Sequence, residues 1–386
     1  MDITIHPGKL FGEIDIIPSK SMAHRLLICA VFADAPTTLL CADTNQDIEA
    51  TADCLRALGA DIRRTDDSYE IIPVREIPSS AYLNCCESGS TLRFMLPIVG
   101  ALGVKATIKM EGRLPQRPLS PLWEEMERMG CTLSRPTVNS ISCKGKLRPG
   151  TYTIAGNVSS QFITGLLFAF DLMDAPCVLN ITEKVESAPY IEMTKAVLEL
   201  FSGHHSPGTV TVEGDWSNGA FFLAASALGN NVTVNNLSLE SVQGDRAVVY
   251  WLPKLKENCK ISVADIPDLV PILSVVAACN KGAVFTDIQR LRLKESDRVA
   301  SVIAMLEALG GKAVADESTL TVYGTGLNGG IVSSYNDHRI AMSAAIAATV
   351  CNKAVTILGA ECVQKSYPKF FEEYNRLGGN YEQHLR

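Results

Sequence analysis

The chain has 386 residues, of which 47% are apolar and 20% charged, so it can bury sizeable cores and is not intrinsically disordered. At about 100–200 residues per domain, this length predicts two or three domains. The net charge of −7 excludes a chain-wide basic surface for nucleic acid, and no apolar segment of the sequence is long enough to span a bilayer.

The N-terminus and the cysteines indicate the compartment. Met1–His6 has no basic start followed by an apolar stretch, so it is not a signal peptide. The twelve cysteines are scattered without metal-ligand spacing, which predicts buried free thiols and no zinc site. We therefore expect a cytoplasmic protein without a metal.

Six polar, turn-like clusters each run directly into an apolar helix. In chain order, the predicted helices are 22–32 after Ser19-Lys20-Ser21, 92–102 after Ser88-Gly89-Ser90, 162–170 after Ser159-Ser160-Gln161, 220–228 after Ser217-Asn218, 269–279 after Pro267-Asp268, and 340–350 after Asn336-Asp337. Between them, amphipathic helices end in Gly59, Gly130, Gly310 and Gly378, and strands follow. Alternating stretches at 152–154 and 319–322 are typical of strands. Each repeat therefore contains strand, helix, strand, helix and further strands, and six repeats divide most simply into two domains of three.

The six helices are apolar almost all round, which predicts that they are buried on every side. The polar clusters at their N-termini carry Ser, Gly or Asp, which are favourable N-caps. A helix N-terminus also attracts anions, because its N–H groups are free and its dipole end is positive. Plain capping explains any one of these clusters, but six together, most of them beside cations, favour anion binding.

Eight cations recur in or near these clusters of an acidic protein: Lys20, Arg25, Arg93, Arg117, Lys294, Arg298, Arg339 and Lys365. Arginine suits bidentate contact with phosphate or carboxylate, and lysine acts as a point charge. The pattern predicts one or two strongly anionic small substrates.

The strings around these cations carry a resemblance. Residues 18–25 (PSKSMAHR), 88–93 (SGSTLR), 116–119 (QRPL), 159–162 (SSQF), 266–268 (IPD), 292–298 (RLKESDR), 336–342 (NDHRIAM) and 362–368 (CVQKSYP) resemble, in the same order, the motifs of the 5-enolpyruvylshikimate-3-phosphate synthase family. The resemblance covers essentially the whole chain. It implies an α/β fold, a two-domain inside-out α/β barrel of six βαβαββ units, with three units in each domain. It places one domain at residues 19–213 and the other at 1–18 plus 214–386, with the active site in the cleft between them.

The implied reaction is transfer of the enolpyruvyl group of phosphoenolpyruvate to the 5-hydroxyl of shikimate 3-phosphate, with release of phosphate. This addition and elimination is a step of the shikimate pathway to chorismate and the aromatic amino acids, and it needs no cofactor or metal. The partners are thus two small-molecule substrates, without nucleic acid or membrane, and we expect a monomer.

The resemblance also implies residue roles. Asp268 is the expected base, Glu295 the expected acid, and Lys20 a further catalytic residue. The residues expected to hold shikimate 3-phosphate are Lys20, Ser21, Arg25, Ser159, Ser160, Gln161, Ser187, Tyr190, Asp268 and Lys294. Those expected to hold phosphoenolpyruvate are Lys20, Gly89, Arg93, Arg117, Gln161, Arg298, Arg339 and Lys365. Taken alone, Asp268 could be a helix N-cap and Glu295 a surface partner of Arg298, and Asp337 is better explained as a cap or an orienting residue for Arg339.

Two residues and two short segments depart from the family pattern. Glu87 stands where many relatives carry Asn, and Phe94 where some carry Pro. Segments 201–208 and 251–258 are too short for the usual helix-strand-strand content, so we expect either missing strands on an outer face of the middle units or a chain that is not the complete natural product.

Two alternatives remain open. The enzyme that transfers enolpyruvate to UDP-N-acetylglucosamine shares the fold, but it has a cysteine in a loop that here, at 111–117, has none. A catalytically inactive anion-binding homologue is disfavoured by the presence of Asp268, Glu295 and the cations.

Overall fold

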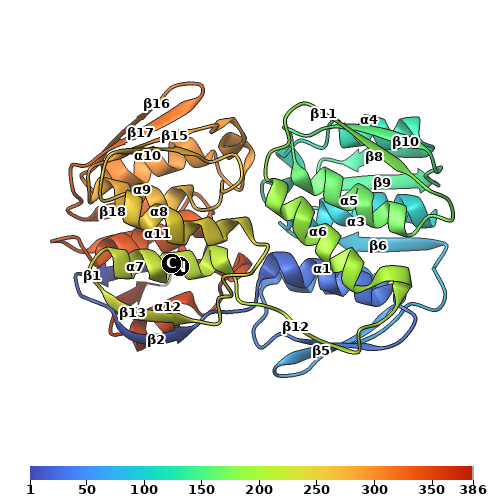
Figure 1. The fold of residues 1–386 in the computed structure, drawn as a ribbon, viewed down its shortest axis with the longest axis horizontal. Helices are drawn as coiled ribbons and strands as arrows, with labels where there is room; N and C mark the ends of the chain where they lie inside the picture. The colour runs from blue at the N-terminus through green and yellow to red at the C-terminus, as the bar shows by residue number, and fades with distance from the viewer. Residues whose placement is uncertain (385–386) are drawn as a thin grey trace. The chain divides into compact units, whose positions relative to one another are not determined.

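The computed structural model describes residues 1–384, which form two compact bodies. The inserted body is Pro18–Glu213. The terminal body comprises Met1–Ile17 and the chain from Gly214 onward, so it contains both ends of the chain. Both bodies are mixed α/β structures with helices inside and sheets outside (Figure 1). No helix within the described residues is long and apolar enough to cross a membrane.

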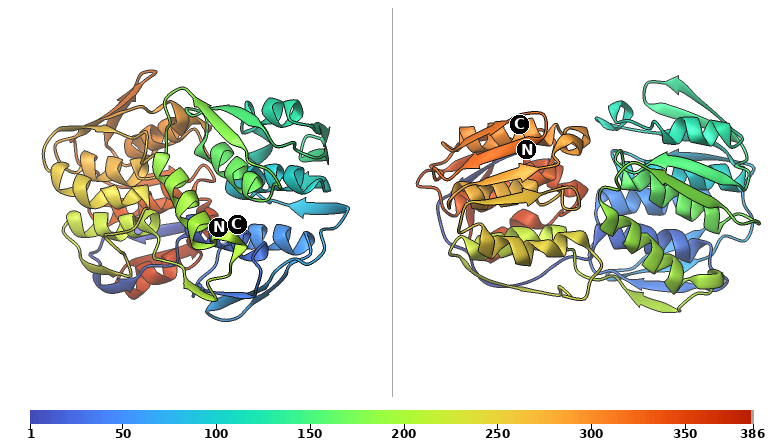
Figure 2. Two further views of the ribbon diagram at one scale, coloured as in Figure 1. Left: turned by 45° about the vertical axis from the view of Figure 1, so that its right-hand side comes forward. Right: turned by 45° about the horizontal axis from the view of Figure 1, so that its top comes forward.

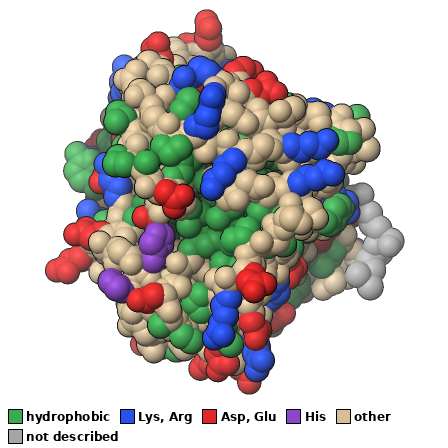
Figure 3. All heavy atoms as spheres, turned by 90° about the vertical axis from the view of Figure 1, so that its right-hand side faces the viewer, with side chains coloured by type: hydrophobic (Ala, Val, Ile, Leu, Met, Phe, Trp, Pro, Cys, Tyr) green, Lys and Arg blue, Asp and Glu red, His purple; other side chains and the backbone are tan. Residues whose placement is uncertain are grey.

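The inserted body has three sheets. Their strands, in spatial order, are β12 (Thr209–Thr211), β3 (Thr37–Leu40), β5 (Ser68–Ile72) and β4 (Asp61–Arg64); β6 (Ser80–Asn84), β7 (Lys105–Lys109), β9 (Ser140–Gly145) and β8 (Cys131–Thr137); and β10 (Thr151–Ala155) with β11 (Val178–Thr182). Its helices are α1 (Lys20–Val31), α2 (Gln46–Ala57), α3 (Gly89–Leu102), α4 (Leu122–Arg128), α5 (Ser160–Asp171) and α6 (Ala188–Leu200), with short 3-10 turns η1 (Leu114–Gln116) and η2 (Ser202–His204). Seen from the side of this body, a hydrophobic area lies in the middle of the surface, with lysine and arginine above it (Figure 3).

The terminal body also has three sheets. They are β18 (Gly330–Ser333), β19 (Val355–Leu358), β1 (Asp2–His6) and β20 (Asn380–His384); β14 (Cys259–Ser262), β15 (Ala283–Thr286), β17 (Thr319–Tyr323) and β16 (Lys312–Ala315); and β13 (Asn231–Asn235) with β2 (Phe11–Asp15). The helices are α7 (Trp216–Ala227), α8 (Val248–Lys254), α9 (Val270–Ala278), α10 (Arg298–Ala308), α11 (His338–Ala348) and α12 (Phe370–Arg376), with 3-10 turns η3 (Gly244–Ala247), η4 (Gln289–Leu293) and η5 (Ala360–Lys365). The first and last strands of the described residues, β1 and β20, lie side by side because they pair (Figure 2).

The four-stranded sheets share one order. In each, the first pair is parallel and the other two pairs are antiparallel, as in β6-β7-β9-β8. The β10-β11 and β2-β13 sheets contain only a parallel pair. After α6 the described chain passes through η2 directly to β12, and after α8 directly to β14. The hairpin that completes the larger sheets has no counterpart in these two segments.

The apolar helices form the cores, as the sequence predicts. Every residue of α9 and of α11 is buried, and α7, α9 and α11 contact one another inside the terminal body. In the inserted body, α3 packs closely on α5, and the Cβ of an alanine at Gly165 would lie only 2.2 Å from the Arg93 carbonyl oxygen. The cysteines are free, and most of them are buried.

The predicted helices are all present, and each begins within four residues of its predicted start, but the capping of two of them differs from expectation. Helix α7 begins four residues earlier than predicted and is capped by Asp215, whose Oδ1 accepts from Asn218 N at 2.8 Å; Ser217 and Asn218 therefore lie in its first turn. Helix α9 has no side-chain cap, so the interpretation of Asp268 as an N-cap is wrong. The Asp268 carboxylate instead forms ion pairs.

Candidate functional site

The start of α1 brings two predicted cations to separate partners. Lys20, at the first position of α1, donates to Asp47 Oδ2 at 2.8 Å, and both side chains are mostly buried. The sequence alone does not single out Asp47, because one acidic residue in an amphipathic helix has no distinguishing signal.

Arg25 lies one turn further along α1 and is 2% exposed. Its guanidinium donates to Ser21 O at 2.7 Å, Tyr190 O at 2.8 Å and Thr194 Oγ1 at 2.9 Å. These acceptors are neutral, and burial lowers the pKa of Arg25 to about 10. Within residues 1–384, no carboxylate forms an ion pair with this buried cation, so an anionic ligand would supply the missing charge.

A second group of predicted residues surrounds the start of α3. Arg93 is 3% exposed and donates to Gln161 Oε1 at 3.0 Å, while Gln161 Nε2 donates to Ser90 Oγ at 2.9 Å. The backbone at Gly89 is so close to two guanidinium groups that a Cβ there would lie 2.6 Å from Arg117 Nη1 and 2.7 Å from Arg93 Nη1. Glycine at the start of α3 therefore leaves room for the guanidinium groups of both arginines.

The remaining predicted residues of the inserted body lie at the N-termini of α5 and α6. Ser159 caps α5 by accepting from Gln161 N at 3.3 Å, and Ser160 is the first helical residue. Ser187 precedes α6 in the left-handed region with a φ of 58°, and it is 2% exposed. The Tyr190 carbonyl accepts from Arg25, so α6 is joined to α1 through this arginine. Glu87, which departs from the family pattern, packs against Gly112.

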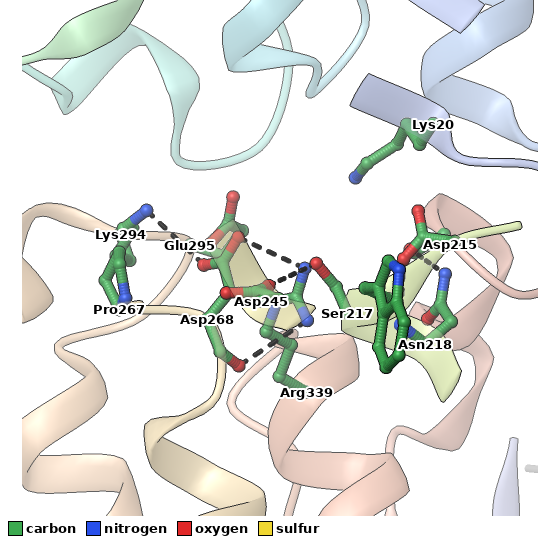
Figure 4. A network of polar contacts seen from close by, with 12 residues as sticks. Lys20, Asp215, Ser217, Asn218, Asp245, Pro267, Asp268, Lys294, Glu295 and Arg339 are labelled. Atoms are coloured by element: carbon green, nitrogen blue, oxygen red, sulfur yellow. Dashed lines mark hydrogen bonds and ion pairs between the residues drawn. The ribbon is translucent and has the colours of Figure 1, made fainter. Parts of the chain in front are cut away.

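The terminal body holds an ion-pair network centred on Arg298, whose side chain is 0% exposed (Figure 4 shows several of its members). Arg298 donates to Asp268 Oδ1 at 2.7 Å, Glu295 Oε2 at 2.7 Å and Asp337 Oδ2 at 3.1 Å. Asp337 is interpreted from the sequence as a cap or as an orienting residue for Arg339. It is the N-cap of α11, accepting from Arg339 N at 3.0 Å, and its side chain forms an ion pair with Arg298. Glu295 forms the pair with Arg298 that was its alternative interpretation, and it remains 26% exposed.

Asp268 is the most strongly paired carboxylate in this network. Besides Arg298, its oxygens accept from Arg339 Nη2 at 3.2 Å and from Lys294 Nζ at 3.4 Å. Burial acts to raise the pKa of Asp268, but Arg339, Lys294 and Arg298 together hold it well below the usual range. Burial lowers the pKa of Lys294 to about 8. Asp268 is therefore ionised, and it can gain affinity for a proton only when some of this positive charge is engaged elsewhere.

Lys365 is the last residue of η5, is 7% exposed, and donates to Asn336 O at 2.9 Å. The predicted residues of the terminal body thus lie at the N-termini of α9, α10 and α11 and in the turns beside them. The described residues contain no group of three or more His, Cys, Asp and Glu side chains that could hold a metal ion.

Comparison with known proteins identifies the family. The family model described as EPSP synthase (3-phosphoshikimate 1-carboxyvinyltransferase) matches residues 5–374. Curated relatives of that name are 35% identical in Clostridium beijerinckii, over 99% of this chain and 98% of the relative, and 36% identical in Clostridioides difficile, with the same coverage. The first of these alignments runs over 428 positions, against 386 residues here, so the relative has segments that this chain lacks.

Solved structures show the same fold. EPSP synthase from Acinetobacter baumannii superposes with a TM-score of 0.80 at 22% identity, over 99% of this chain and all of that one. The enolpyruvyl transferase NikO from Streptomyces tendae gives 0.78 at 16% identity, over 100% of this chain and 99% of that one. From the family match and the relatives above 30% identity, the chain belongs to the EPSP synthase (3-phosphoshikimate 1-carboxyvinyltransferase) family.

Proposed function

We propose that the chain transfers the enolpyruvyl group of phosphoenolpyruvate to the 5-hydroxyl of shikimate 3-phosphate and releases inorganic phosphate. The observation that carries this proposal is the combination of the family match with the two sets of cations around α1, α3 and Asp268. Two phosphates and two carboxylates enter the reaction, and buried arginine and lysine side chains are the groups that can replace their hydration.

The reaction has two steps. In the addition, the 5-hydroxyl oxygen bonds to C2 of phosphoenolpyruvate, the hydroxyl proton leaves to a base, and C3 takes a proton and becomes a methyl group. In the elimination, the C2–O bond to phosphate breaks and the methyl group returns one proton. We assign the base to Asp268 and the acid at C3 to Glu295. Ligand anions that draw Arg339 and Lys294 away from Asp268 raise its pKa, so substrate binding itself activates the base.

The ligand sites that we propose are made of the predicted residues described above. Shikimate 3-phosphate is held by Lys20, Ser21, Arg25, Ser159, Ser160, Gln161, Ser187, Tyr190, Asp268 and Lys294. Phosphoenolpyruvate is held by Lys20, Gly89, Arg93, Arg117, Gln161, Arg298, Arg339 and Lys365. Because Arg298 is fully buried among three carboxylates, its contact with phosphoenolpyruvate requires the substrate carboxylate to displace one of them.

We also propose the six-unit organisation and a site completed between the domains. The shared strand order of four sheets, with two sheets reduced to a parallel pair, supports six βαβαββ units in an inside-out barrel, of which two lack their final hairpin. The residues assigned to each substrate are divided between 19–213 and 214–386, so neither body alone holds a complete set. Catalysis then requires the two bodies to meet around the substrates.

The direct test is release of phosphate from phosphoenolpyruvate with and without shikimate 3-phosphate, in the presence and absence of EDTA. We expect release to require both substrates and to survive EDTA, because lysine and arginine supply the positive charge. Release without shikimate 3-phosphate, or activity restored only by a divalent metal, would contradict the proposal.

Replacing Gly89 by alanine is expected to raise KM for phosphoenolpyruvate at least about tenfold, the equivalent of about 1.4 kcal/mol. The new methyl group displaces the guanidinium groups of Arg93 and Arg117, which lie within 3 Å of its position. Binding of shikimate 3-phosphate alone should change little. Gly100→Ala is the matched control on α3, because its methyl group meets the Cys131 and Leu147 side chains instead. Equal effects of the two variants on KM would remove Gly89 from the phosphoenolpyruvate site.

A further inference from the structure

Asp245 is a buried carboxyl group that the proposed mechanism does not use. It lies in η3, is 2% exposed, and its Oδ2 accepts a hydrogen bond from the Ser217 hydroxyl. Its other oxygen, Oδ1, is buried and receives no hydrogen bond from the described residues. The neighbouring Gln243 fixes the turn to the start of α7, because its side chain donates to Gly214 O at 2.8 Å and accepts from Trp216 N at 3.0 Å.

Several charged and polar groups act on this carboxyl. Asp268 and Asp215 are acidic neighbours, Arg339 is the cation, and the Ser217 hydroxyl is the hydrogen-bond donor. Figure 4 shows Asp245 in the same group of side chains as Asp268, Arg339 and Ser217. Burial, and then the charge of Asp268, raise the pKa of Asp245 to about 7, against the opposing effects of Arg339 and Ser217. Asp245 therefore shares the charge of Arg339 with Asp268.

We infer that Asp245 takes up a proton when phosphoenolpyruvate binds at Arg339. The inference rests on the proposed function, which makes Arg339 a ligand of this substrate. An anion at Arg339 cancels much of the positive charge that favours the ionised form of Asp245, while burial and the unpaired oxygen still disfavour it. Asp245 touches neither substrate in this scheme. It is a positioning residue that acts through Arg339, because its protonation removes a carboxylate that competes with the ligand for that guanidinium.

Proton uptake by Asp245 would make the affinity for phosphoenolpyruvate depend on pH. If binding adds a proton to Asp245, affinity must fall as the pH rises, by up to tenfold for each pH unit when one full proton is taken up. Lys294, with a pKa near 8, also gains a proton when anions bind beside it, and the substrate phosphate titrates as well. The contribution of Asp245 is therefore the difference in protons taken up per bound ligand between the unaltered protein and its Asp245→Asn variant, measured with the same ligand.

The experiment is calorimetric titration with phosphoenolpyruvate at pH 6.5, 7.5 and 8.5, in pairs of buffers with different ionisation enthalpies. The protein is saturated with a shikimate 3-phosphate analogue that lacks the 5-hydroxyl, so that binding occurs without turnover. The buffer dependence of the heat gives the protons taken up per ligand. At pH 7.5 we expect a measurable fraction of a proton more for the unaltered protein than for Asp245→Asn. Asp316→Asn, in an exposed turn, is the matched control and should take up as many protons per ligand as the unaltered protein.

A second variant keeps the inference testable if Asp245→Asn does not fold. Ser217→Ala removes the hydrogen bond that favours the ionised form of Asp245, so proton uptake should move to higher pH. Equal proton counts for the unaltered protein and Asp245→Asn, or an unchanged pH dependence in Ser217→Ala, would overturn the inference while leaving the enolpyruvyl transfer intact. Failure to bind phosphoenolpyruvate, together with failure to release phosphate, would overturn the proposed function and the inference with it.

Discussion

Replacing Arg298 by methionine is expected to lower the free energy of unfolding by about 3–5 kcal/mol at pH 7, the usual cost of removing one partner from a buried ion pair. Arg298 is 0% exposed and contacts three carboxylates, of which Asp337 is also fully buried. Methionine fills much of the volume but leaves these negative charges together in a site of low polarity. Urea unfolding followed by tryptophan fluorescence measures the change, because Trp216 and Trp251 lie in the terminal body.

The pH dependence of the free energy of unfolding separates the loss of ion pairs in Arg298→Met from the loss of packing. The pKa of Asp268 is held low in the folded protein, so its ion pairs stabilise the fold above the unfolded pKa of about 4 and lose their effect as the pH falls through the folded value. The difference between the unaltered protein and Arg298→Met should therefore shrink as the pH is lowered below about 4. Arg292→Met is the control: its pair with Asp297, at 3.6 Å, is partly exposed, and its loss should cost less than about 1 kcal/mol. Equal losses for the two variants would show that the buried network does not stabilise the fold.

The six apolar helices could be predicted from the sequence because each combines a polar start with an apolar run that is visible locally. Strands within β10 and β17 were also predicted from alternation alone. The start of α7 was misplaced, because Ser217 and Asn218 have the composition of a cap while Asp215, further back, makes the capping bond. Several residue types can cap a helix, and only the backbone geometry selects among them.

The partners of the cations could not be predicted. Asp47 and Asp245 lie 27 and 28 residues from Lys20 and Ser217, the side chains that donate to them, and each is a single acidic residue without a motif of its own. Sequence similarity indicated where the cations are, but the folded chain determines which carboxylates neutralise them. Around Arg298 those carboxylates include both proposed catalytic residues, so the groups that stabilise this region are also the groups assigned to the chemistry.

Replacing Glu295 by glutamine is expected to lower kcat by about 10²–10⁴-fold, the range for a positioned general acid. The amide keeps the shape of the side chain but cannot deliver a proton to C3 of phosphoenolpyruvate. Binding of shikimate 3-phosphate should change little, because Glu295 is paired with Arg298, which is assigned to phosphoenolpyruvate. Phosphate release gives kcat. Glu307→Gln, an exposed substitution on helix α10, which begins three residues after Glu295, is the control and should keep its activity.

Asp268→Asn should lower kcat by at least about 10²-fold, and it differs from Glu295→Gln in its effect on binding. Asp268 neutralises Arg298, Arg339 and Lys294, so the asparagine variant leaves these cations with excess positive charge and should bind anionic ligands at least as tightly. Deuterium transfer distinguishes the base from the acid at C3. When the reaction runs in D2O, the methyl group of the intermediate takes up solvent deuterium. The deuterium then appears in the methylene group of recovered phosphoenolpyruvate. Glu295→Gln should abolish this exchange. Near-normal turnover in either variant would remove that residue from the mechanism, and exchange that persists in Glu295→Gln at the unaltered rate would assign the C3 proton to another group.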